Sequence, residues 1–122
     1  MINELSKQIH ENNKAKGFYE DEKNIGEMLA LIHSEVSEAL EADRKGRTVS
    51  HKFQRSWSEK LSDKAFKEMF EANVKDSFED ELADIMIRVM DLSAFKGVDI
   101  EGHIMAKLRF NAMRPYKHGK KY

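Results

Sequence analysis

Residues 78–96, FEDELADIMIRVMDLSAFK, decide the fold that we predict for this chain. Apolar residues recur there at helical spacing and form one stripe, made of Leu82, Ile85, Met86, Val89, Met90 and Leu92. Charged residues recur at alternating steps of three and four on another face, at Glu81, Asp84, Arg88 and Asp91. The stretch therefore predicts one helix that supplies both part of the core and a row of carboxylates.

An earlier stretch, residues 31–42 or LIHSEVSEALEA, shows the same combination. Its apolar side is formed by Ile32, Val36, Ala39 and Leu40. Glu35 and Glu38 lie one turn apart on a neighbouring stripe. We expect the two helices to pack together, with the pair Glu35 and Glu38 facing the pair Glu81 and Asp84.

The remaining pattern predicts an all-α protein in a single domain over residues 1–122. We expect a first helix that ends near Gly17 and a long helix over about residues 24–45. Further helices are expected over residues 64–74, 78–96 and about 100–113, the last closed by Pro115. Residues 47–57 keep no helical period and are predicted as a loop. The fold is thus a bundle of about four main helices with an inserted loop and short helix.

Composition and charge exclude several classes of protein. The chain has 122 residues and no cysteine, so disulfides and thiol chemistry are excluded. Its net charge is only -1, so the bulk charge does not favour binding to a polyanion. Residues 79–101 nevertheless carry seven acids against two bases, and the residues after 101 carry six bases and no acid. No stretch is apolar over membrane-spanning length, and we expect a soluble, cytoplasmic protein.

The two acidic pairs together predict a metal site. In each pair the spacing is i, i+3, which projects both carboxylates from one helix face. Four carboxylates around one pocket would repel one another without a cation, and a hard cation such as Mg²⁺ takes oxygen ligands. Either pair alone is more often a solvated helix face. Here both pairs border the apolar stripes, which favours a site at the edge of the core.

These motifs resemble those of the all-α nucleoside triphosphate pyrophosphohydrolases of the MazG-like superfamily, which is related to the dimeric dUTPases. The family signature is an ExxE on one helix and an ExxD on a later one, matched by Glu35 and Glu38 and by Glu81 and Asp84. The resemblance implies that these four residues are catalytic and hold Mg²⁺, with Mn²⁺ as the alternative ion. The enzyme would cut a (d)NTP between the α- and β-phosphates, giving a nucleoside monophosphate and pyrophosphate, in nucleotide-pool house-cleaning. It also implies a homodimer or homotetramer.

A third block of the resemblance lies near the C-terminus. Lys107, Asn111 and Arg114 share one helix face, and the basic stretch PYKHGK with Lys117 follows. The family implies that these residues contact phosphates, whereas by sequence alone they could be a solvated face that neutralises the acidic helix. Side chains of the first helix lie near the base in relatives, which points to His10 and Asn13, although a plain surface role is the more common one for each. Phe18, Phe53, Trp57 and Tyr116 could stack on a base, but aromatic residues in a small domain more often lie in the core or a subunit interface.

The sequence leaves alternatives open. The acidic pairs are separated by 43 positions, counted from Glu38 to Glu81, which is longer than in the simplest family members, so the insertion within residues 47–76 leaves the base undetermined. A non-catalytic helical module that binds nucleic acid through the basic tail is one alternative, which the acidic helix disfavours. A regulatory protein that binds nucleotide without turnover is another. The sugar, the use of diphosphates and the number of metal ions also stay open.

Overall fold

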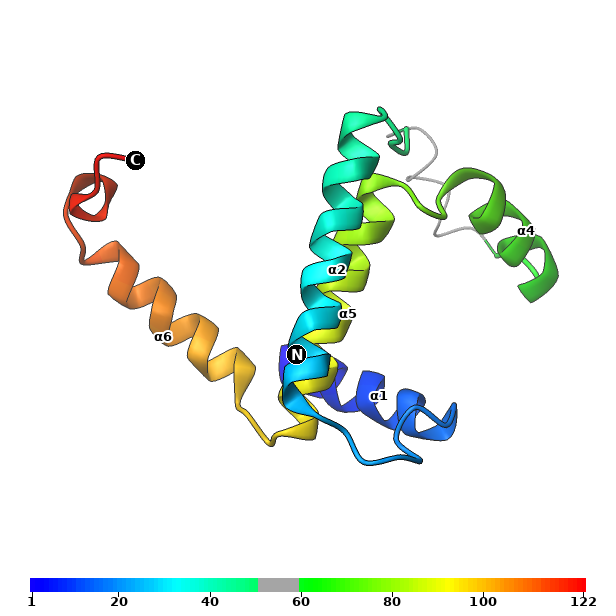
Figure 1. The fold of residues 1–122 in the computed structure, drawn as a ribbon, viewed down its shortest axis with the longest axis horizontal. Coiled ribbons are helices and arrows are strands. Elements are labelled where there is room, and N and C mark those ends of the chain that lie inside the picture. Colours follow the sequence, from blue (N-terminus) through cyan, green and yellow to red (C-terminus); the bar gives the residue numbers. More distant parts are fainter. Residues whose placement is uncertain (51–59) are drawn as a thin grey trace. The chain divides into compact units, whose positions relative to one another are not determined.

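The computed structural model describes residues 1–50 and 60–122, and these residues form helices and connecting turns without a strand (Figure 1). The helices are α1 (Ile2–Ala15), α2 (Ile25–Arg44), α4 (Asp63–Asn73), α5 (Phe78–Phe95) and α6 (Ile100–Ala112), followed by a short 3₁₀ turn, η2 (Tyr116–Gly119). The predicted all-α class is confirmed, and each predicted helix is present with ends close to those expected. Phe53, Trp57 and part of the predicted loop lie outside the described residues.

Side-chain caps explain where three of the helices begin. The oxygen atoms of Asn24, Ser62 and Asp99 accept the backbone N–H of Glu27, Ala65 and Gly102 at 3.2, 3.2 and 2.9 Å, at the first turns of α2, α4 and α6. Each bond satisfies an N–H that has no partner within the helix. These caps are polar residues directly before an apolar period, which is why the starts of the helices were predictable.

Glycine residues explain where two of the helices end. Gly46 follows α2 and Gly97 follows α5, and both have positive φ, +67° and +68°. A residue with a Cβ is strained in this region, so glycine there stops a helix at little cost. The predicted ends at Gly46 and Gly97 are confirmed.

The described residues divide into two compact units. The first comprises residues 1–22 and 89–122, and the second comprises residues 23–88. The boundary falls inside α5, between Arg88 and Val89. The single-domain organisation stays a prediction.

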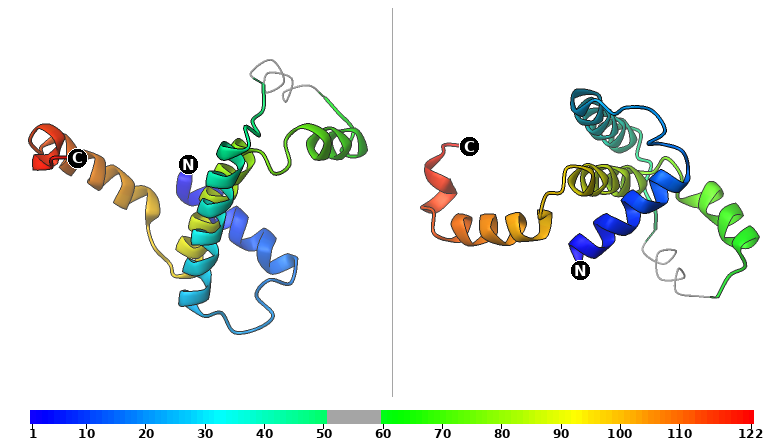
Figure 2. Two further views of the ribbon diagram at one scale, coloured as in Figure 1. Left: turned by 45° about the horizontal axis from the view of Figure 1, so that its top comes forward. Right: turned by 90° about the horizontal axis from the view of Figure 1, so that it is seen from below.

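In the second unit, α2 and the 78–88 part of α5 lie side by side and run in opposite directions (Figures 1 and 2). Ala39 and Ala42 of α2 are buried, and so is Val74, which follows α4. Several residues of the predicted apolar stripes are exposed instead of buried, namely Val36, Leu40, Leu82 and Met86, and Leu29 and Leu31 are exposed as well. The helical spacing predicted the faces on which these side chains lie, but not whether another element covers them.

The first unit is held by a polar network around Asp91 of α5. Asp91 Oδ1 lies 2.9 Å from Nδ1 of His10 in α1, and Asp91 Oδ2 accepts the hydroxyl of Tyr19 at 2.6 Å. The rings of His10 and Tyr19 meet edge to face at 4.6 Å, and Phe95 lies 5.2 Å from the Tyr19 ring. The network is half-buried, so it ties α1 and the following connector to α5 with little access of water.

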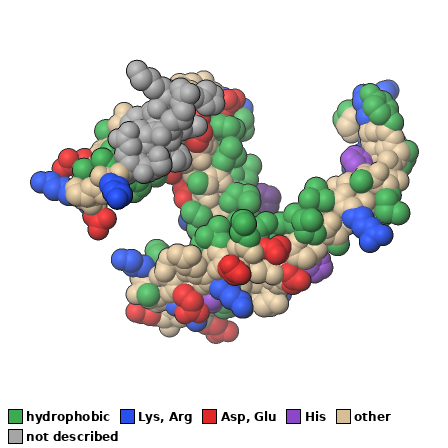
Figure 3. Space-filling model, turned by 180° about the vertical axis from the view of Figure 1, so that it is seen from behind, with side chains coloured by type: hydrophobic (Ala, Val, Ile, Leu, Met, Phe, Trp, Pro, Cys, Tyr) green, Lys and Arg blue, Asp and Glu red, His purple; other side chains and the backbone are tan. Residues whose placement is uncertain are grey.

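The start of α1 is also bonded to the start of α6 in this unit. The Asn3 side-chain amide donates to Asp99 at 2.6 Å, and the Met1 amino group lies 2.9 Å from Glu101. Beyond these contacts α6 carries exposed apolar side chains, visible along its length at the right of Figure 3, among them Met105, Leu108 and Phe110. Among the described residues, none of the helices is both long enough and apolar enough to cross a bilayer.

Substituting Tyr19 with phenylalanine tests the network. The Tyr19→Phe variant should lose about 1–2 kcal/mol of unfolding free energy, because the half-buried Asp91 carboxylate loses a donor that no water easily replaces. Urea unfolding should show a lower midpoint with an unchanged slope. Tyr122→Phe, at an exposed residue, is the matched control, and equal midpoints for both variants would show that the network does not stabilise the fold.

Candidate metal centre

Three carboxylates from two helices meet in the second unit. Glu35 and Glu38 project from α2, and Glu81 projects from the first turn of α5. One oxygen from each lies within 4.8 Å of the others. The antiparallel course of the two helices brings the ExxE of α2 opposite the start of α5. Three of the four residues that we predicted to face one another, Glu35, Glu38 and Glu81, therefore lie together.

Two of these carboxylates are buried more completely than carboxylates usually are. Glu35 is 8% exposed and Glu81 is 5% exposed. Oε1 of Glu35 accepts the Nε–H of Arg88 at 2.9 Å. The Oε2 atoms of Glu35 and Glu81 are buried and have no hydrogen-bond partner among the described residues. Because a buried acceptor without a donor is costly, the two oxygens indicate that a proton or a cation belongs between them.

The pKa values show how the cluster bears its charge without a cation. Burial raises the pKa of Glu35, but the hydrogen bond from the Arg88 guanidinium and the neighbouring carboxyl groups outweigh it and hold the pKa below its usual range. Burial first, and then the neighbouring carboxyl groups of Glu35 and Glu38, raise the pKa of Glu81 to about 8. Glu81 therefore carries a proton at neutral pH in the cation-free protein. A divalent cation would take the place of that proton.

Asp84, the fourth predicted ligand, lies outside the group of three that meets within 4.8 Å. Its pKa is raised by burial first and then by the nearby charges of Asp80 and Glu35, so the charges of the cluster reach its carboxylate. Arg88, which the sequence placed on the same charged face of α5, pairs with Glu35 of α2 at 2.9 Å. It supplies one positive charge to a group of several carboxylates.

A second acidic group adjoins the first and was missed as a possible site in the sequence. Oxygens of Asp76, Asp80 and Glu81 also lie within 4.8 Å of one another, so Glu81 belongs to both groups. Asp76 has a φ of 64°, and its N–H donates to Oδ2 of Asp80 at 2.9 Å. The signal was the i, i+4 spacing of Asp76 and Asp80, which at the start of the predicted helix is also what a cap and a first-turn acid would give.

The predicted phosphate-binding residues lie in the first unit. Lys107 Nζ and Arg114 Cζ lie 5.1 and 5.7 Å from the centre of the Phe110 ring, so both cationic side chains lie beside one aromatic side chain. Asn111 is half-buried, and its Oδ1 has no partner among the described residues. Lys117 is exposed in η2. That these residues act together with the carboxylates stays a prediction.

The predicted base-binding residues also belong to the first unit. His10 is hydrogen-bonded to Asp91 and packs edge to face against the Tyr19 ring, so its contacts hold the fold together. Asn13 is half-buried in α1. Phe18 and Tyr116 are exposed, at 60% and 88%. A contact of any of these residues with a base stays a prediction.

Comparisons with known proteins add no assignment to this geometry. The chain matches no protein-family model, and searches of curated proteins and of solved structures found no match. The chemistry of the site is therefore argued from its residues.

The shared proton predicts how stability depends on pH. The pKa of Glu81 is about 4.5 in the unfolded chain and about 8 in the folded protein, so its contribution is complete below pH 4.5 and is lost as pH rises through 8. Asp84 acts in the same direction. In EDTA the melting temperature should fall by roughly 5–10 °C between pH 5 and pH 8.5.

The Glu81→Gln variant should flatten this dependence, because the amide donates as the protonated acid does but does not titrate. Glu68→Gln, on the exposed side of α4, should melt with the wild-type profile. Glu35 has a lowered pKa and so loses its contribution only as pH falls below 4.5, outside this window. A Glu81→Gln profile as steep as that of the wild type would place the proton elsewhere.

Proposed function

We propose that the chain is a Mg²⁺-dependent nucleoside triphosphate pyrophosphohydrolase of the MazG-like type, acting on a (d)NTP in nucleotide-pool house-cleaning. One observation carries the proposal: helices α2 and α5 each bury a carboxylate whose Oε2 atom has no partner in the part of the chain that the structure describes, and these carboxylates belong to the ExxE and ExxD motifs. A solvated acidic face would not bury these oxygens. The resemblance described above supplies the reaction class.

The donor set fits a hard divalent cation. Glu35, Glu38 and Glu81 offer carboxylate oxygens within 4.8 Å of one another, and Asp84 lies near enough for its pKa to respond to them. Such all-oxygen sites suit Mg²⁺, and Mn²⁺ is the alternative ion. When bound, the ion would supply Lewis-acid polarisation of phosphate oxygens and charge neutralisation as a P–O bond of the bridge between the α- and β-phosphates breaks.

The chain's own residues have separable roles in this proposal. Arg88 holds Oε1 of Glu35, which fixes the orientation of that carboxylate and leaves Oε2 available. Asp84 lies outside the tight group and has a raised pKa, which suits it to accept the proton of the attacking water. Products are a nucleoside monophosphate and pyrophosphate.

The basic face of α6 contacts the phosphates in this proposal. Lys107 and Arg114 are concentrated at Phe110, and Asn111 keeps a buried oxygen without a partner among the described residues. Lys117 extends the positive charge toward the C-terminus. The exposed apolar side chains of α2 and α6 support association of the chain into a homodimer or homotetramer.

Pyrophosphate release tests the proposed activity. Wild-type protein should release pyrophosphate from at least one member of a panel of NTPs and dNTPs in Mg²⁺ and none in EDTA. Glu38→Ala and Asp84→Asn should lower kcat by about 100-fold or more, since each removes a carboxylate from the reaction centre. Glu41→Gln, one turn after Glu38 and exposed, is the matched control and should keep wild-type kinetics.

Cation binding gives a second readout that does not need turnover. Mg²⁺ at about 100 times its dissociation constant should raise the melting temperature of wild type by roughly 10 °C. The rise should be much smaller in Glu38→Ala. A folded wild-type protein that shows neither the melting shift nor pyrophosphate release would overturn the proposal, and salt-sensitive binding to DNA or RNA without Mg²⁺ would then favour the nucleic-acid module.

A further inference from the structure

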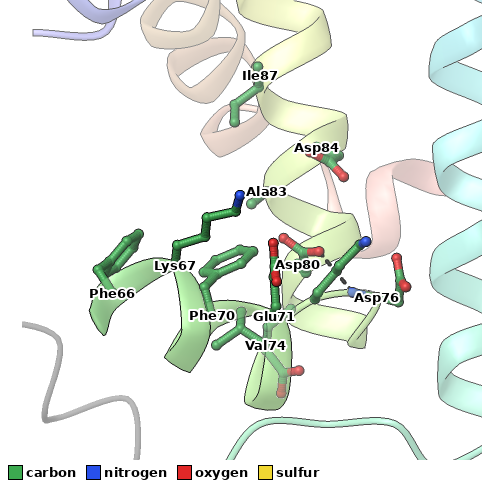
Figure 4. A pocket seen from close by; sticks show the side chains of 12 residues that line it. Phe66, Lys67, Phe70, Glu71, Val74, Asp76, Asp80, Ala83, Asp84 and Ile87 are labelled. Atoms are coloured by element: carbon green, nitrogen blue, oxygen red, sulfur yellow. Dashed lines mark hydrogen bonds between the residues drawn. The ribbon is translucent and has the colours of Figure 1, made fainter. Parts of the chain in front are cut away.

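A cavity of about 700 Å³ lies between α4 and α5 in the second unit (Figure 4). Its volume falls within the range of about 300–1,000 Å³ that is usual for ligand pockets. One wall is apolar and is formed by Phe66, Phe70, Val74, Ala83 and Ile87. Its charged lining comprises the acids Glu71, Asp76, Glu79, Asp80 and Asp84 and the bases Lys67 and Lys75. The cavity thus has an apolar half and a highly charged half.

The aromatic wall is open to a flat ligand. Phe70 is half-buried, and its ring centre lies 5.9 Å from that of Phe66. Val74, 2% exposed, supports the inner end of α4. Figure 4 shows the Phe70 ring facing the space between the two helices and Phe66 at its outer edge. A planar ring could stack on Phe70, as bases stack on aromatic side chains in many nucleotide sites.

The charged rim joins the cavity to the candidate metal centre. Asp76 and Asp80 share an acidic group with Glu81, and Glu81 belongs to the group formed with Glu35 and Glu38. Asp84 lies at the edge of the cavity, and its carboxylate points toward α2 in Figure 4. A purely apolar ligand would leave these acids dehydrated, and a bare anion would be repelled. A ligand with a flat ring at one end and a cation-bound anion at the other fits both halves.

Lys67 makes the cavity selective. Figure 4 shows its side chain extending from α4 toward Ala83 of α5, above the Phe70 ring. No ion pair is present at Lys67 among the described residues, so its amino group has donors to offer inside the cavity. An ammonium group donates hydrogen bonds and accepts none. It therefore favours a ring that presents an exocyclic oxygen there and disfavours one that presents an amino group.

We infer that the cavity between α4 and α5 binds the base of the nucleotide, with Phe70 stacking on it and Lys67 selecting bases with an exocyclic oxygen, such as guanine, hypoxanthine, uracil or thymine. The inference rests on the proposed function and specifies which bases the enzyme would prefer in its nucleotide substrate. It assigns base recognition to the predicted insertion and not to His10 and Asn13. The helix that lengthens the segment between the acidic pairs thereby gains a role.

Steady-state kinetics with three substrates test the inference: an oxo-base triphosphate, an amino-base triphosphate and inorganic tripolyphosphate, which has no base. Phe70→Leu keeps an apolar side chain but not the ring, and should raise KM for the nucleotides about 5- to 10-fold. Phe70→Tyr, which keeps a ring, should restore KM. Lys67→Met should lower the preference for oxo over amino bases about tenfold. Neither Phe70→Leu nor Lys67→Met should alter the kinetics measured with tripolyphosphate.

Lys64→Met, on the same helix but outside the cavity, is the matched control and should keep wild-type kinetics. A second readout is NMR of the methyl groups of Val74, Ala83 and Ile87, which should shift when an oxo-base nucleotide binds. Unchanged KM and base preference in Phe70→Leu and Lys67→Met, with wild type active, would overturn this inference and leave the proposed function intact. Absence of pyrophosphate release by wild type would overturn both.

Discussion

The second unit depends on how Glu35 and Glu81, two buried carboxylates on neighbouring helices, are compensated. Burial removes water from these groups, and Arg88 provides one guanidinium for a cluster that also contains Glu38. The cation-free protein meets the deficit by keeping a proton on Glu81. The packing of α2 against α5 is thereby linked to the occupation of the site, because whatever neutralises the cluster also stabilises the contact between the helices.

The same need for compensation explains why the acids along α5 have different roles. Its first turns carry the acids that face α2 and the cavity beside α4, whereas its last turns carry Asp91, which has His10 and Tyr19 as partners. Asp91 needs no further partner, since both of its oxygens are bonded. Glu81 does need one. Acids of similar appearance on one helix thus differ in function because of the groups that tertiary packing brings to them.

The burial of the apolar side chains differs from what their spacing indicates. Helix α2 buries Ala39 and Ala42, while Val36 and Leu40 stay exposed. An apolar residue at helical spacing shows that a face prefers to be covered, but not by what. The long side chains of Glu35, Glu38 and Glu81 meet between α2 and α5, while the large apolar residues stay exposed.

The sequence by itself determined the helices and their ends, because caps such as Asn24 and Ser62 and stops such as Gly46 and Gly97 act within a few residues. It also identified the pairs Glu35 and Glu38, and Glu81 and Asp84, since i, i+3 spacing places both members of a pair on one helix face. Only the tertiary structure decided that Asp84 lies at the edge of the three-carboxylate group and that Asp76 and Asp80 extend it. It alone paired Arg88 with Glu35 and placed α4 beside α5 to form a cavity. These outcomes depend on distances between segments far apart in the chain, which local spacing does not encode.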